Sequence, residues 1–214
     1  MAEGHTALAH QFDDLAQQDE ASKLGMWAFL LTEIMLFGGL FTGYAIYRLA
    51  YPEGFAEGSH HLDVLLGTLN TGVLIASSLM MAMAVHAAQA GRQRLLTRFL
   101  LLTMGLGLVF LGIKGYEYWH KFHEHLIPGL AFEYVSPQAR YVELFLFFYF
   151  VMTGLHAIHM IIGLGLLAAL VVLGWRGRFS PTYYTPVEIV GLYWHFVDIV
   201  WIFLYPLLYL IGRH

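Results

Sequence analysis

Several ionisable side chains of this sequence lie inside apolar stretches. Glu33 lies in LLTEIMLFGG, His156 and His159 lie in TGLHAIHMIIG, and His195 and Asp198 lie in YWHFVDIVWIFLY. Carboxyl and imidazole groups relay protons, bind metal ions or form hydrogen bonds between helices. A charge in hydrocarbon costs about 3 kcal/mol on insertion scales, so each of these groups needs a partner or a function.

Glu33 has three interpretations. It lies about ten residues into its apolar stretch, which places it ~15 Å deep at 1.5 Å per residue. It could relay protons, contact lipid, or form a neutral acid that is hydrogen-bonded to a neighbouring helix. The residues alone leave these alternatives open.

The remaining groups predict a polar seam between helices. His156 and His159 are three residues apart and lie on neighbouring helical positions, while Glu188, His195 and Asp198 follow one face of another helix. Carboxylates that bond to imidazole or indole N–H groups of a neighbouring helix would keep polar atoms away from lipid. We therefore expect this seam to fix the register of the helices.

Metal and haem binding are the less favoured interpretations. There are twelve histidines and no cysteine, and the apolar stretches contain only His86, His156, His159 and His195. A pair of haems in a membrane cytochrome needs paired histidines spaced along two helices, whereas His156 and His159 are one turn apart. The sequence predicts no metal site and no haem site in this chain.

The composition indicates a helical membrane protein. Hydrophobic residues make up 58% of the 214 residues and charged residues 12%, about half the share of a soluble protein. We expect an all-α, polytopic bundle of five transmembrane helices in residues 24–214, after a soluble tail at 1–23. The expected spans are Leu24–Leu49, Leu62–Ala88, Leu95–Trp119, Val142–Trp175 and Pro186–Ile211.

Basic residues in the short connections predict the topology. Arg92, Arg94 and Arg98 flank the second connection, and Arg176 and Arg178 lie in the fourth. Positive connections face the cytoplasm, which places the N-terminus inside and the C-terminus outside. The third connection is longer, has no assigned role and has room for a short surface helix.

Other functions find little support. The chain has no phosphate-binding loop, no nucleophile elbow and no HExxH motif, and its net charge of -4 gives no indication of nucleic-acid binding. A membrane subunit or a small standalone transporter remains. Ion flux in liposomes would support the transporter, and a Soret band on the single chain would support a membrane cytochrome.

Five motifs resemble one family in their order and spacing. They are KLGMWAFLLTEIMLFGGLF, LNTGVLIASSLMMAMAVHAA, KGYEYWH, TGLHAIHMIIG and YWHFVDIVWIFLY. The sequence resembles subunit III of the haem–copper oxidases, most closely the bacterial cytochrome c oxidases. The resemblance extends from Lys23 to Gly212.

The resemblance implies a noncatalytic subunit of an enzyme that reduces oxygen to water while protons are pumped. Such a subunit carries no haem and no copper, packs on the haem–copper subunit I beside subunit II, supports proton uptake and stability, and binds phospholipids. Glu33 matches the buried carboxylate of the family. His156, His159, His195 and Asp198 match its HxxH and WHFVD elements, Glu117 matches a helix-ending acid, and Arg48 is a candidate for a lipid headgroup.

One departure concerns length. The longer family form has seven helices, and this chain lacks the first two, as does the shorter bacterial form. Either extra helices of another subunit or of a further respiratory complex replace the pair, or lipid binding is altered. The resemblance also leaves a quinol oxidase subunit or a nitric oxide reductase accessory subunit as alternatives, and it implies a bacterial plasma membrane location.

Overall fold

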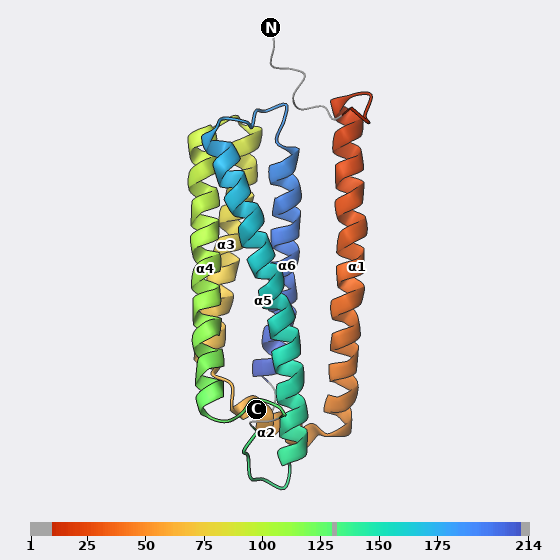
Figure 1. Cartoon of the computed structure of the whole chain (residues 1–214), viewed down its shortest axis with the longest axis vertical. Helices are drawn as coiled ribbons and strands as arrows, with labels where there is room; N and C mark the ends of the chain where they lie inside the picture. The colour runs from red at the N-terminus through yellow and green to blue at the C-terminus, as the bar shows by residue number, and fades with distance from the viewer. Residues whose placement is uncertain (1–9, 130–131, 211–214) are drawn as a thin grey trace.

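The computed structural model describes residues 10–129 and 132–210. This part of the chain folds into six α-helices, and five of them are long and apolar enough to cross a membrane (Figure 1). The five are α1 (Leu15–Ala50), α3 (Val64–Gln89), α4 (Gln93–His123), α5 (Ala139–Trp175) and α6 (Thr185–Tyr209). The predicted all-α fold with five spanning helices is confirmed.

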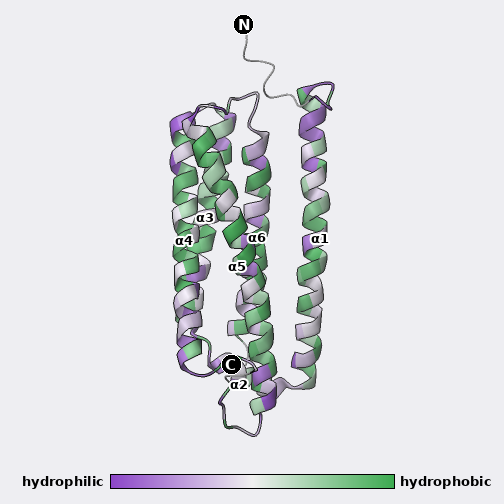
Figure 2. Ribbon diagram, in the orientation of Figure 1, coloured by the Kyte–Doolittle hydropathy of each residue, from purple (hydrophilic) through white to green (hydrophobic). Residues whose placement is uncertain are grey.

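Hydropathy along the helices follows the expected membrane pattern. Apolar residues occupy the middle of each long helix, and polar residues gather toward the two ends of the bundle (Figure 2). The connections after α3 and α5 lie at the same end as the start of α1 (Figure 1). The arginine-bearing connections thus share one side, and which side faces the cytoplasm stays a prediction.

The first spanning helix begins at Leu15, whereas we expected Leu24. The Asp14 side chain accepts a hydrogen bond from the Gln17 backbone N–H at 2.7 Å, which caps the helix. Lys23 then pairs with Asp19 at 2.9 Å and with Glu188 of α6 at 3.1 Å. These polar contacts extend the helix beyond the apolar stretch, so part of the expected tail is helical.

The short helix α2 (Pro52–His60) lies in the first connection, not in the third. Pro52 occupies its first turn, where a missing N–H costs nothing. Gly54 and Gly58 bring α2 against Tyr141 and Phe145 of α5, because an added Cβ would lie 2.4 and 2.6 Å from those side chains. The described part of the third connection, outside residues 130 and 131, consists of turns and of residues without regular secondary structure.

The interior is centred on α6, which is the helix with the largest buried share. Trp194 and Trp201 are fully buried there. The indole N–H of Trp194 donates to Ser77, and that of Trp201 donates to Thr71, both at 3.1 Å. These bonds fix the register of α6 against α3. Helix α1 lies to one side and packs mainly on α6 (Figure 1).

Candidate functional site

Glu33 lies near the middle of α1 and contacts α5. Its Oε2 is 3.0 Å from Nε2 of His159, and the two side chains are 14% and 10% exposed. The other ring nitrogen, Nδ1, is 2.9 Å from the carbonyl oxygen of Leu155, and the backbone carbonyl of His159 accepts a hydrogen bond from Tyr193. The carboxyl group therefore connects α1 to a fixed imidazole.

The geometry of this pair allows two hydrogen-bonding arrangements. The carbonyl of Leu155 can only accept, so Nδ1 of His159 is the donor in that bond. Nε2 can then accept from the acid form of Glu33 or donate to its carboxylate.

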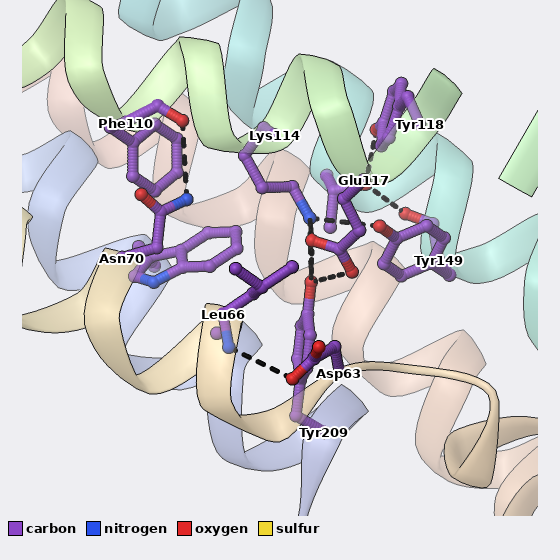
Figure 3. Close-up of polar contacts among 12 residues, drawn as sticks. Asp63, Leu66, Asn70, Phe110, Lys114, Glu117, Tyr118, Tyr149 and Tyr209 are labelled. Atoms are coloured by element: carbon purple, nitrogen blue, oxygen red, sulfur yellow. Dashed lines mark hydrogen bonds and ion pairs between the residues drawn. The ribbon is translucent and has the colours of Figure 1, made fainter. Parts of the chain in front are cut away.

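A second polar cluster surrounds Lys114 in the second half of α4 (Figure 3). Nζ of Lys114 lies 2.9 Å from Oε2 of Glu117, 2.7 Å from the hydroxyl of Tyr209 and 3.0 Å from that of Tyr149. Tyr209 also donates to Glu117 at 2.7 Å. Lys114 and Glu117 are 5% and 4% exposed, so this is a buried ion pair whose hydrogen bonds join α4, α5 and α6.

His156 lies in an aromatic environment. Its ring centroid is 5.4 Å from that of Phe110 and 5.2 Å from that of Trp201. Within residues 10–129 and 132–210, neither ring nitrogen has a hydrogen-bond partner. His156 faces the interior of the bundle, whereas His159 faces α1, so the two histidines belong to different surroundings.

His195 and Asp198 lie one turn apart on α6 and face α3. Nδ1 of His195 is 2.7 Å from the hydroxyl of Ser78. Asp198 is only 3% exposed, and Ser78 lies beside it. Neither carboxyl oxygen of Asp198 has a hydrogen bond of acceptable geometry to any described residue.

Two further residues lie near the ends of the helices. Glu188 is in the first turn of α6 and pairs with Lys23, away from His195 and Asp198. Arg48 is partly exposed in the last turn of α1. The predicted seam residues thus occupy separate clusters rather than one continuous line.

The sequence analysis missed Lys114, Ser78 and Tyr209 as members of these clusters. Lys114 and Glu117 have the i,i+3 spacing of a helical ion pair, which was a usable signal. Ser78 and Tyr209 had no such signal, because serine and tyrosine are common in membrane helices and their partners lie on other helices.

The fold and the clusters define a multi-pass helical membrane protein whose ionisable groups mostly bond one helix to another. The described residues contain no group of three or more histidine, aspartate or glutamate side chains placed to hold a metal ion. Ionisable groups that bond helices to one another suit a structural scaffold.

The model of the family described as cytochrome c oxidase subunit III matches residues 9–213. A cytochrome c oxidase subunit 3 from Synechocystis sp. is 36% identical over 191 residues, which cover 87% of this chain and 74% of that protein. One from Thermostichus vulcanus is 31% identical over 212 residues, covering 97% and 95%. A probable quinol oxidase subunit 3 from Staphylococcus epidermidis is 31% identical over 206 residues, covering 95% and 96%. The chain belongs to the cytochrome c oxidase subunit III family.

Proposed function

We propose that this chain is the noncatalytic subunit III of a proton-pumping cytochrome c oxidase in a bacterial plasma membrane. It packs on a haem–copper subunit I beside subunit II, and these partners carry the haem and copper. The observation that carries the proposal is the family match over residues 9–213, joined to a fold of five spanning helices. The buried Lys114–Glu117 and Glu33–His159 pairs fit this scaffold role, because they bond helices together.

The contact between Glu33 and His159 supports a role in proton uptake. The pair lies close to the middle of α1 and is only slightly exposed, so it is shielded from bulk water. A carboxyl group and an imidazole within hydrogen-bond distance are the side chains that relay protons inside membrane proteins. In this proposal the pair supports proton entry into the neighbouring subunit, and the chain itself carries no catalytic centre.

A pocket near one end of α1 supports phospholipid binding. It has a volume of about 680 Å³ and lies between the end of α1 and the start of α5. Arg140 and the stacked rings of Tyr51 and Tyr141, 4.1 Å apart, line it together with Tyr47. A guanidinium suits a phosphate, and aromatic rings suit the membrane interface. Arg48, one residue beyond Tyr47, is the second headgroup candidate.

The identity of the electron donor has a direct test. The chain would be tagged and purified in mild detergent from its own membranes, and the haem spectrum and oxygen consumption of the preparation would be measured. We expect copurified haem, and faster oxygen consumption with reduced cytochrome c than with a reduced quinol. Faster consumption with the quinol would favour the quinol oxidase alternative, which the Staphylococcus relative supports.

The same preparation separates the scaffold from other functions. The purified single chain should have no Soret band and should cause no proton or ion flux in liposomes. Flux through the chain alone would favour a standalone transporter. Absence of copurified haem from a preparation that retains the chain in its native membranes would contradict the proposed function.

A further inference from the structure

Five arginines at one end of the bundle form a positively charged surface. Three lie at the start of α4 and two directly after α5, and all are exposed: Arg92, Arg94, Arg98, Arg176 and Arg178. None of these side chains forms an ion pair with a carboxylate in residues 10–129 or 132–210. The sequence has no aspartate or glutamate at 64–116 or at 144–187, so the chain around this arginine surface offers no counter-charge.

Packing holds the two arginine-bearing connections together. The side-chain amide of Gln93 donates a hydrogen bond to the backbone carbonyl of Phe179, whose ring is buried. A Cβ added to Gly91 would lie 2.9 Å from Cγ of Pro181, so the connection before α4 touches the connection after α5. Retention of a connection in the cytoplasm requires only that the charges are present, not that they are fixed in space. The arginines are thus held close together, as a binding surface requires.

The arginine surface adjoins exposed apolar helix surface. Helices α4 and α5 touch at Thr97 and Gly174, because a Cβ added to Gly174 would lie 3.1 Å from Oγ1 of Thr97. The next residue of α4 is Arg98, and Leu102, one turn further, is 52% exposed. The next residue of α5 is Trp175, which is 68% exposed. Cations and indole rings beside aliphatic residues are typical of the boundary between lipid headgroups and acyl chains.

The carboxylates at the start of α1 and α6 do not neutralise the arginine surface. Asp19 and Glu188 both pair with Lys23, at 2.9 and 3.1 Å. Among the described helices, α1 contacts α2, α5 and α6 but neither α3 nor α4, and it lies on the other side of the bundle from α4 (Figure 1). The charge of Lys23 is therefore balanced within the chain, whereas the charge of the arginine surface is not.

We infer that the arginine surface binds the headgroups of anionic phospholipids in the leaflet at this end of the bundle. A guanidinium group binds phosphate oxygens through two parallel N–H bonds. Each cation beside a spanning helix favours anionic headgroups by about fivefold. The acyl chains then lie along the exposed apolar residues that begin at Trp175 and Leu102. An acidic segment of a partner protein would match the charge but not this apolar boundary.

This inference does not depend on the proposed function. The surface lies at the end of α5, whereas the pocket that contains Arg140 lies at its start. The two lipid sites thus belong to opposite leaflets, and either can fail without the other.

Photolabelling in nanodiscs tests the site. The tagged chain, with the subunits that copurify, would be placed in phosphatidylcholine containing a small share of phosphatidylglycerol that has a photoreactive headgroup. We expect irradiation to label the peptides with Arg98 and Trp175 at least about threefold more than a phosphatidylcholine probe of the same design. High salt should reduce this preference. Equal labelling by the two probes would overturn the inference.

A double variant tests the arginines themselves. Arg94→Gln, Arg98→Gln should lower phosphatidylglycerol labelling of the Trp175 peptide about threefold to tenfold. Lys23→Gln is the matched control, because it removes a cation at the same end whose charge Asp19 and Glu188 already balance. It should leave the labelling unchanged. Unchanged labelling in the double variant, or an equal loss in the control, would count against the site.

Further arms identify the ligand and report folding. Excess glycerol 3-phosphate, which has no acyl chain, should not compete with the lipid probe; competition would assign the surface to free phosphate esters instead. Absence of label from both peptides in the assembled preparation would mean that a partner protein covers the surface, and would also overturn the inference. The melting temperature reports the folding of each variant. If the double variant unfolds, the comparison of the two lipid probes on the unmodified chain decides.

Discussion

The buried ion pair of Lys114 and Glu117 depends on its tyrosines. Bringing an ammonium and a carboxylate out of water costs several kcal/mol per ion, and their attraction offsets this only where further hydrogen bonds are made. The hydroxyls of Tyr149 and Tyr209 lie within hydrogen-bond distance of Lys114, and Tyr209 also donates to Glu117. The four side chains therefore act as one unit.

We expect the substitution Lys114→Met to destabilise the chain by about 3 to 5 kcal/mol, because it leaves the carboxylate of Glu117 buried without its cation. The double variant Lys114→Met, Glu117→Leu should recover most of that loss, since no charge is then stranded. Unfolding in detergent, followed by tryptophan fluorescence, measures both. A double variant as unstable as the sum of the two single variants would show that the charges are not coupled.

Substitutions of Glu33 test the hydrogen bond between Glu33 of α1 and His159 of α5. In Glu33→Gln the side-chain amide can donate to Nε2 of His159, so we expect the complex to assemble normally. In Glu33→Leu the imidazole loses its partner, and we expect the melting temperature of the chain to fall, with a loss of about 1 to 3 kcal/mol.

Copurification with the haem-bearing subunit and thermal melting would measure both variants. Failure of the Gln variant to assemble would mean that the negative charge, rather than the hydrogen bond, is required at Glu33.

At this scale the sequence indicated which residues are polar and buried, but not which residues meet. His156 and His159 are three residues apart, and yet one packs between Phe110 and Trp201 while the other faces Glu33. The rotation of α5 about its axis decides this, and a single helix carries no information about its neighbours. The surroundings of the Asp198 carboxyl group depend on the position of α3 in the same way.

At the scale of helices, close packing depends on glycines around Trp194. A Cβ added to Gly163 would lie 2.9 Å from its ring, and one added to Gly107 would lie 2.8 Å from it. The ring of Trp194 thus reaches the backbones of α4 and α5 where side chains are absent, and small residues commonly allow such close packing in membrane bundles.

Gly163→Ala should therefore destabilise the bundle by about 1 to 2 kcal/mol, since overpacking outweighs the better helix propensity of alanine. Gly165 is a matched control two residues away, because nothing lies within 4 Å of a Cβ added there. Gly165→Ala should leave thermal stability unchanged or slightly raised. Equal effects of the two substitutions would contradict the packing argument.

The docking of α2 should weaken in acid. Hydrogen bonds from Ser136 and Tyr134 hold the pKa of Glu57 below its ordinary value of 4.5, and burial holds the pKa of His61 below its ordinary value of 6.5. Both groups thus resist protonation in the folded chain. The contribution of each group to the stability of the docked α2 is fully present above its ordinary pKa, 6.5 for His61 and 4.5 for Glu57. As the pH drops, the contribution of His61 falls first and that of Glu57 falls next.

Amide hydrogen exchange of Pro52–His60, corrected for the intrinsic effect of pH, should show lower protection at pH 5.5 than at pH 7.5. His61→Phe should remove this loss of protection between pH 7.5 and pH 5.5. Glu57→Gln should remove the further loss of protection below pH 4.5. Protection of α2 that is independent of pH in the unmodified chain would refute the prediction.

The positions of the five spanning helices followed from long apolar stretches, whereas the position of α2 did not. The sequence YPEGFAEGSHH has the proline and glycines of a turn. In the folded chain Pro52 starts a helix, and Gly54 and Gly58 form the small face that packs on α5. Tertiary packing overrode the local signal, and the same holds for the polar extension of α1, whose partner Glu188 lies far along the chain.

At the scale of the whole molecule, the chain is a bundle whose ends differ in charge. The clustered arginines lie in or next to the connections after α3 and α5, and the connection after α4 lies at the opposite end (Figure 1). Because positive connections stay in the cytoplasm, the first pair should face inward and the connection after α4 outward. The fold fixes which connections share a side, but a membrane potential and an insertion machinery decide which side it is.

Single cysteines can test this orientation, since the chain has none of its own. Val135, fully exposed after α4, and Thr182, exposed after α5, lie at opposite ends of the bundle. A membrane-impermeant maleimide should label Val135→Cys in intact cells, with the outer membrane opened where one is present. It should label Thr182→Cys only in inverted vesicles. The reverse pattern would place the N-terminus outside, and labelling of both cysteines from one side would contradict the single span, α5, between Val135 and Thr182.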